Sequence, residues 1–153
     1  MLKYCLECWD KHKGELENEL RSRTDLNYCE YIDLVRMIVK NVFVEDIVWD
    51  HSNITEIDNG DYQGTLLFLI PTNTYQPSEN EYLMTYVGYG SCSVCDTLQS
   101  IQEGWRNEPL TERQVKDYMA LCKDIVTNTI KPYNYGLRAN EKFTVVEMEN
   151  EKL

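Results

Sequence analysis

The residues most able to do chemistry in this sequence are two Cys-x-x-Cys pairs, Cys5/Cys8 and Cys92/Cys95. Four thiolates arranged as a tetrahedron bind zinc, so the two pairs together could supply a complete zinc site. Against that site, 83 residues lie between Cys8 and Cys92, and the first pair falls inside a predicted helix. Cys5 lies near the buried side of that helix, where a free cysteine acts as a small hydrophobic side chain. We therefore expect no cofactor, with zinc on these four cysteines as the alternative.

The pair Cys92/Cys95 also suggests thiol chemistry, because it lies between a predicted strand and a predicted short helix. The N-terminus of a helix lowers the pKa of a nearby thiol, and thioredoxin-like redox sites use this effect. The predicted order of elements, however, lacks the βαβ unit that precedes the antiparallel strands of that fold, and the charge of Asp96 opposes a thiolate. The structural alternative is that Ser91, Ser93 and Asp96 cap the helix while the two cysteines pack.

The two histidines, His12 and His51, give little support for a hydrolytic site. His51 could form an acid–base pair with Asp50, but neighbouring residues of a strand point to opposite faces of a sheet. The sequence therefore favours a protein that is not an enzyme.

The acidic residues are unevenly distributed along the chain. The net charge is −11, and residues 41–105 carry −10 of it because they include ten acids and no Lys or Arg. A phosphate backbone is bound mainly through Lys and Arg, so we expect no direct contact with nucleic acid. An acidic surface attracts basic proteins or cations, although acidity can also serve solubility alone. The candidate partner-binding residues are six acids of this stretch: Glu45, Asp46, Asp50, Glu56, Asp58 and Asp61.

Apolar residues recur at helical spacing in several stretches. The pattern predicts about four helices, over residues 2–21, 27–43, 96–103 and 111–130. The second helix should be opened by the Thr24–Asp25 region, and the last by a capping box of Thr111 and Gln114. Pro132 should end the last helix.

Alternating and apolar runs predict strands over residues 54–58, 62–70, 82–89 and 143–148. Asn59-Gly60 predicts a tight hairpin, in which both turn positions need positive φ. The order of the elements favours a single α+β domain over residues 1–153, with an antiparallel sheet of three to four strands packed by about four helices. We expect the tail, residues 149–153, to be frayed.

The sequence also bears on the compartment. The longest purely apolar run, Leu66–Ile70, is far shorter than the roughly 20 residues of a membrane-spanning helix. The first eight residues lack the basic and apolar regions of a secretion signal. These observations predict a soluble, cytoplasmic protein without membrane contacts, whose six cysteines stay as thiols or bind metal.

Part of the sequence resembles a known group of proteins. The segments that carry the likeness are Tyr62–Thr65 (YQGT) and Gly88–Gln99 (GYGSCSVCDTLQ). They resemble small acidic proteins carried by phages and mobile elements of Gram-positive bacteria, in which Gly usually stands at the position of Val94. That group has no assigned activity, so the resemblance implies no functional residue. It implies a setting, the contest between phage and host.

Charge and setting together predict a non-enzymatic acidic binding protein with a basic protein as its partner. In a phage, that partner would be a host protein that handles nucleic acid, such as a CRISPR nuclease or another defence nuclease, and binding would inhibit it. The alternative is a zinc- or thiol-dependent protein centred on Cys92 and Cys95.

Overall fold

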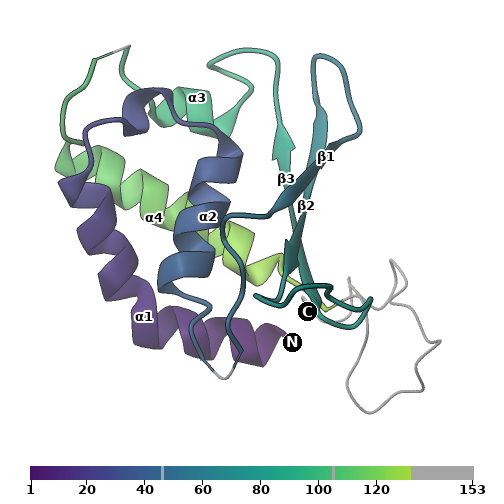
Figure 1. The fold of residues 1–153 in the computed structure, drawn as a ribbon. Helices are drawn as coiled ribbons and strands as arrows, with labels where there is room; N and C mark the ends of the chain where they lie inside the picture. Colours follow the sequence, from purple (N-terminus) through teal and green to yellow (C-terminus); the bar gives the residue numbers. More distant parts are fainter. Residues whose placement is uncertain (46, 105, 132–153) are drawn as a thin grey trace.

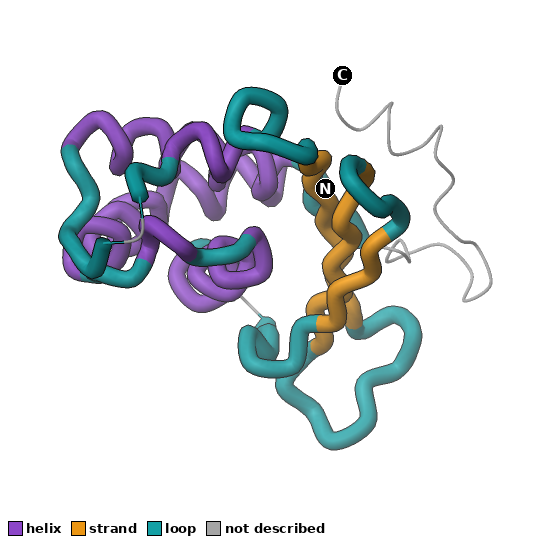
Figure 2. Tube along the Cα trace, turned by 90° about the horizontal axis from the view of Figure 1, so that it is seen from above, coloured by secondary structure: helices purple, strands orange, loops and turns teal. Residues whose placement is uncertain are grey.

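The computed structural model describes residues 1–45, 47–104 and 106–131, and it has the α+β architecture that the sequence predicts. The described residues form four α-helices and one antiparallel sheet of three strands. The helices gather on one side of the sheet (Figure 1), and the same separation is visible from above (Figure 2). In chain order the elements are α1 (Leu2–Ser22), α2 (Tyr31–Asn41), β1 (Thr55–Asp58), β2 (Gly64–Pro71), β3 (Tyr82–Tyr89), α3 (Thr97–Ile101) and α4 (Glu112–Thr127).

Strand β2 lies in the middle of the sheet, with β1 on one side and β3 on the other. Phe68 of β2 pairs with Glu56 of β1 and with Thr85 of β3. Phe68 and Ile70 are fully buried, whereas Leu69 between them is half-buried. Because side chains alternate along a strand, Phe68 and its paired residues share the face that turns toward the helices. Strand β1 is an edge strand, and all four of its residues are exposed.

The apolar stripes predicted for the first and last helices are confirmed. Trp9 and Leu16 of α1 are buried, as are Val115, Tyr118 and Ile125 of α4. Removing a side chain of this size from water is worth about 1.5–3 kcal/mol. The packing of α1, α2 and α4 on one another therefore supplies most of the described core.

A buried polar network joins the start of α4 to the segment before α2. The predicted capping box is confirmed: Gln114 donates its backbone N–H to the Thr111 hydroxyl at 3.2 Å, and its side-chain oxygen accepts the Thr111 N–H at 3.0 Å. The amide nitrogen of Gln114 also donates to Asn27 Oδ1 at 2.8 Å and to the Ile101 carbonyl at 3.0 Å. One buried side chain thus caps its own helix and ties down two distant segments.

The helix predicted over residues 27–43 is shorter than expected. Leu26–Tyr28 form a separate 3₁₀ turn, and α2 begins only at Tyr31. The Leu26 carbonyl accepts the Tyr118 hydroxyl at 2.5 Å, and the Asn27 side chain is engaged by Gln114. These distant partners hold Leu26–Tyr28 in place as a turn of its own. The helical spacing predicts Tyr28 on the buried side of that helix, and this prediction is wrong, since Tyr28 is exposed.

The hairpin is also wider than the sequence predicts. Asp58 pairs with Leu66, so the connection is not a two-residue turn, and Gly60 has no positive φ. The Asn59 side chain accepts the Thr65 N–H at 2.7 Å, and the Asp58 carboxylate accepts the Gly60 N–H at 2.9 Å. Side-chain acceptors therefore hold open a longer loop. A Cβ at Gly60 would clash with the Gln63 carbonyl, which explains the glycine.

The end of the described chain differs slightly from expectation. Helix α4 stops at Thr127, and Ile130 forms an antiparallel bridge with Met84 of β3. Asp46, Pro132, the strand predicted over 143–148 and the tail at 149–153 lie outside the described residues. In the described part of the chain, no helix combines the length and the apolar composition that a membrane crossing requires.

Replacing Gln114 by Ala should lower the free energy of unfolding by about 2 kcal/mol, because it leaves the buried polar groups of Asn27 and Ile101 without this partner. Lys116→Ala, on the exposed side of the same helix, should change it by less than about 0.5 kcal/mol. Urea denaturation of both variants measures the difference. Equal changes in the free energy of unfolding for the two variants would show that the buried hydrogen bonds of Gln114 do not stabilise the fold.

Candidate functional site

A cavity of about 300 Å³ opens between the start of α2, strands β1 and β2, and the segment Gly90–Gln102. Four of its lining residues are acids: Glu30, Glu56, Asp58 and Asp96. No Lys, Arg or His is among the described residues that line it. The charge of this cavity is therefore of one sign.

The register of the sheet explains why carboxylates point into the cavity. Glu56 pairs with Phe68 and Asp58 pairs with Leu66. Both acids therefore lie on the same face as Phe68, which elsewhere in the sheet carries the core. Acids cannot join an apolar core without a partner. The helices accordingly leave this part of the sheet uncovered, and the cavity occupies the space.

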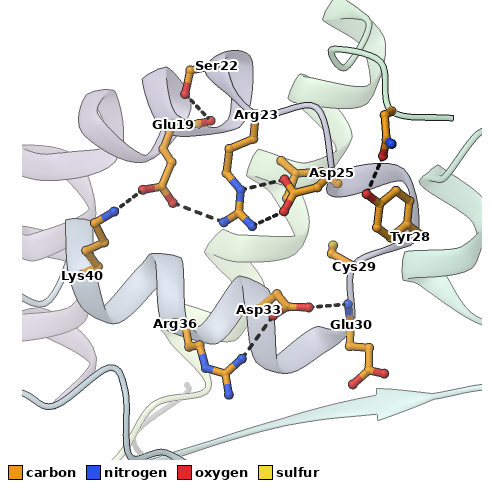
Figure 3. Close-up of polar contacts among 12 residues, drawn as sticks. Glu19, Ser22, Arg23, Asp25, Tyr28, Cys29, Glu30, Asp33, Arg36 and Lys40 are labelled. Carbon is orange, nitrogen blue, oxygen red and sulfur yellow. Dashed lines mark hydrogen bonds and ion pairs between the residues drawn. The ribbon is translucent and has the colours of Figure 1, made fainter.

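Electrostatics within the cavity are unfavourable for Glu56. Burial raises the pKa of the Glu56 carboxyl, and the charges of Glu30 and Asp58 raise it further. Arg36 acts in the opposite direction but is the smallest of the causes. The Arg36 guanidinium donates to the Asp33 carboxylate at 3.2 Å (Figure 3). The nearest cation is thus already paired with an acid on its own helix.

Two further bases, Arg23 before α2 and Lys40 in the last turn of α2, are paired as well (Figure 3). Arg23 contacts Asp25 at 2.6 Å, and Lys40 contacts Glu19 at 2.7 Å. In the same view the Glu30 carboxylate points away from the Arg23–Asp25 pair. These cations form ion pairs with acids close to them, so they do not neutralise the acids of the cavity.

Two hydrogen bonds hold the carboxylate of Asp58 in place. Its carboxylate accepts the Tyr89 hydroxyl at 2.6 Å and the Gly60 N–H at 2.9 Å. These two hydrogen bonds lower the pKa of Asp58. The charge on Asp58 is therefore fixed in place at the mouth of the hairpin loop.

Asp96 connects three walls of the cavity and is only 3% exposed. Its carboxylate accepts the Tyr31 hydroxyl at 2.9 Å, the Gly90 N–H at 3.0 Å and the Gln99 N–H at 2.9 Å. The last bond makes Asp96 the N-cap of α3, as the sequence predicts. It follows that Asp96 holds the shape of the cavity, with its lone pairs already engaged.

The six acids predicted to bind a partner do not share one surface. Glu56 and Asp58 line the cavity, and Asp61 is exposed in the adjoining loop. Asp46 lies outside the described residues. Of the five acids that the structure describes, three are therefore placed together at the hairpin end of the sheet.

Glu45 belongs to a different neighbourhood. Its carboxylate lies 2.7 Å from His12 Nε2 and 3.3 Å from Lys11 Nζ, both on α1. These contacts lower the pKa of Glu45, His12 having the larger effect. Its charge is balanced within the protein.

Asp50 lies at the opposite end of β2 from Asp58. Its N–H donates to the Pro71 carbonyl at 2.8 Å, whereas Asp58 pairs with Leu66. Leu66 and Pro71 are five positions apart along β2, which corresponds to about 16 Å. The Asp50 carboxylate shapes a local turn by accepting from Ser52 and Asn53.

The four cysteines of the two pairs are not brought together. Cys5 and Cys8 are buried in the core, and Cys5 donates its thiol to the Thr129 carbonyl at 3.7 Å. Cys92 and Cys95 are exposed, so the expectation that they pack is wrong. Within the described ranges, no three His, Cys, Asp or Glu side chains are placed so that they could hold a metal ion.

Sequence reasoning missed Glu30 and Asp96 as parts of the site. Glu30 lies outside the stretch that lacks Lys and Arg, and Asp96 was assigned only a capping role. The signal that could have identified Glu30 is an acid at the position just before a helix, where carboxylates are favoured. That both residues line the same cavity as Glu56 is decided by tertiary packing.

Replacing Asp96 by Ala should lower the free energy of unfolding by about 2–4 kcal/mol, because three donors lose a charged acceptor at a buried position. Asp124→Ala, which removes an exposed acid of α4, is the matched control and should have little effect. Thermal and urea unfolding of both variants measure this. If Asp96→Ala lowered the free energy of unfolding only slightly, the role of Asp96 in connecting the walls of the cavity would be contradicted.

Replacing Glu56 by Gln should stabilise the fold slightly at neutral pH, by no more than about 0.5 kcal/mol for so exposed a group. Since the pKa of Glu56 is higher in the folded than in the unfolded state, the unfolded chain releases its proton first as the pH rises. The free energy of unfolding therefore falls as the pH rises above the ordinary pKa of Glu, and at neutral pH it remains at this lower value.

Melting temperatures of wild type and Glu56→Gln at acidic and neutral pH check this sign. The variant should have a higher melting temperature than wild type only at neutral pH, and the same melting temperature at acidic pH, where the Glu56 carboxyl is protonated. A loss at neutral pH would mean that Glu56 is already stabilised by a cation.

Comparisons with protein-family models, with curated proteins and with solved structures find no significant match to this chain.

Proposed function

We propose that this protein is a non-enzymatic binding protein that takes up a Lys or Arg side chain of a basic protein partner in its acid-lined cavity. The observation that carries the proposal is the convergence of Glu30, Glu56 and Asp58 on one cavity whose described lining residues include no Lys, Arg or His. A cavity of about 300 Å³ has room for one such side chain.

The chemistry of the cavity favours a cationic guest. A guanidinium presents N–H donors in a fixed fork that matches carboxylate oxygens, and an ammonium acts as a compact point charge. The raised pKa of Glu56 reflects burial and unbalanced neighbouring charge. A cation between Glu30 and Glu56 would remove the like-charge repulsion, so part of the binding free energy would come from relief of that repulsion.

The wider charge distribution supports the same partner class. Residues 41–105 lack Lys and Arg, and a field of one sign accelerates the encounter with an oppositely charged surface. A basic surface of that kind is characteristic of proteins that bind nucleic acid. The partner is therefore a protein with phosphate-binding Lys or Arg residues, and occupying them would inhibit it, as in the proposed setting of a phage protein acting on a host nuclease.

An oligo-arginine peptide bearing a fluorophore tests the cavity directly. Wild type should bind it at low salt and more weakly near physiological ionic strength, where screening acts over about 8 Å. The double variant Glu30→Gln/Glu56→Gln should bind at least about tenfold more weakly, which corresponds to about 1.4 kcal/mol. Fluorescence anisotropy measures both affinities.

The matched control is Glu15→Gln/Asp124→Asn, which removes the same charge from exposed positions on α1 and α4. It should bind within about twofold of wild type, because it leaves the cavity intact. Equal weakening by the two double variants would mean that net charge alone attracts the peptide, and the proposal would fail. Unfolding curves of all variants exclude loss of the fold as the cause.

A further inference from the structure

Cys92 and Cys95 stand at the two ends of a tight turn. The Cys95 N–H donates to the Cys92 carbonyl at 3.0 Å, and the Asp96 N–H donates to the same carbonyl at 2.8 Å. Such a turn brings the Cα atoms of its first and last residues within about 7 Å, close to the range that a disulfide requires. The two Sγ atoms lie 2.8 Å apart, and both side chains are exposed.

The turn is held in this shape by its surroundings. Gly90 packs directly on the backbone of Cys95, and a Cβ at that position would lie 2.5 Å from the Cys95 carbonyl carbon. The Gly90 N–H is fixed by Asp96, the buried residue that also caps α3. The thiols are therefore brought together by the fold, so that a bond between them needs little further movement.

We propose that Cys92 and Cys95 form a reversible dithiol–disulfide site that exchanges with small disulfide compounds in solution. Cys92 is the attacking thiol and Cys95 the resolving one. This site is separate from the function proposed above and does not depend on what occupies the cavity.

The assignment of the two roles follows from the hydrogen bonds around the sulfurs. The Sγ atoms of Cys92 and Cys95 lie within hydrogen-bonding distance of each other, so the Cys95 thiol can donate to Cys92 once Cys92 is a thiolate. That bond, together with the backbone N–H groups of Cys95 and Val94, lowers the pKa of Cys92. The same pairing raises the pKa of Cys95. The thiolate that attacks is therefore the one on Cys92.

The exchange proceeds in two steps that balance. The Cys92 thiolate attacks one sulfur of a disulfide RSSR, which forms a mixed disulfide Cys92–S–S–R and releases RS⁻. Cys95 then loses its proton to solvent, and its thiolate attacks the Cys92 sulfur, which expels the second RS⁻. In total, two protein thiols become a disulfide while RSSR is reduced to two RSH.

The other described cysteines are unsuited to this reaction. Cys5, Cys8, Cys29 and Cys122 are buried. Burial raises the pKa of Cys29 to about 11 and raises that of Cys122 as well. All four thiols are shielded from solvent, so reaction with a dissolved disulfide should be confined to Cys92 and Cys95.

The sequence makes the test specific. Trypsin cleaves after Lys40 and Arg106 and nowhere between them, so a single peptide, residues 41–106, carries Cys92 and Cys95 and no other cysteine. The intact protein is equilibrated with reduced and oxidised glutathione, quenched with iodoacetamide and digested for mass spectrometry. As the oxidised fraction rises, this peptide should lose both alkyl groups and carry no glutathione, while the four buried cysteines become alkylated after unfolding.

The single variants distinguish a pair from two independent thiols. Cys95→Ser should accumulate a glutathione adduct on Cys92, because the resolving thiol is missing, whereas Cys92→Ser should react several-fold more slowly. Persistence of both alkyl groups in wild type, or glutathione adducts in wild type like those of Cys95→Ser, would overturn the proposal. Equal rates for the two variants would overturn the assignment of the attacking thiol.

Discussion

The buried carboxylate of Asp96 is the interaction on which the functional end of this protein depends. It receives a hydroxyl from α2, an N–H from the turn that follows β3 and an N–H from the first turn of α3. Each bond to a charged acceptor is stronger than one between neutral groups, and removing the acceptor would leave three donors without it. One side chain thereby sets the distance between the start of α2 and the Gly90–Gln102 segment. Both of these segments line the cavity, and the same contacts fix the turn that carries Cys92 and Cys95.

The cavity that Asp96 maintains explains why acids can occupy the inner face of β1. A strand whose inward positions were apolar would be covered by the helices and would add to the core. Here Glu56 and Asp58 occupy those positions, and burial and neighbouring charge act against ionisation of Glu56. Arrangements that lower local stability are typical of functional sites, where ligand binding offsets the lost free energy of folding. The exposed edge strand and its cavity are where the proposed partner would dock.

Local patterns in the sequence were sufficient for much of the fold. The strand over 82–89 and the capping box of Thr111 and Gln114 match the structure, because both depend on neighbours within a few residues. The start of α2 and the shape of the hairpin were not predictable in this way. The first is decided by the contact of Leu26 with Tyr118, and the second by the reach of the Asn59 side chain to Thr65. Neither contact leaves a periodic signal.

The candidate site shows the same division. A stretch without Lys or Arg identified Glu56, Asp58 and Asp61 from composition alone. Composition could not reveal that Glu45 is paired with His12, or that Glu30 faces Glu56 across the cavity. Those facts depend on how α1 and α2 lie against the rest of the chain. Likewise, the spacing of Cys92 and Cys95 suggested thiol chemistry, whereas their exposure follows from the turn that Asp96 anchors.

The most direct measurement of the central claim is a nuclear magnetic resonance titration with the amide of N-acetyl-arginine. The amide of N-acetyl-citrulline, which has nearly the same shape and no charge, serves as the control. If the cavity holds a guanidinium, arginine should shift the resonances of Glu30, Glu56, Asp58 and Tyr89, salt should weaken the effect, and citrulline should leave these resonances unchanged. Shifts confined to other parts of the protein, or equal shifts with citrulline, would contradict it.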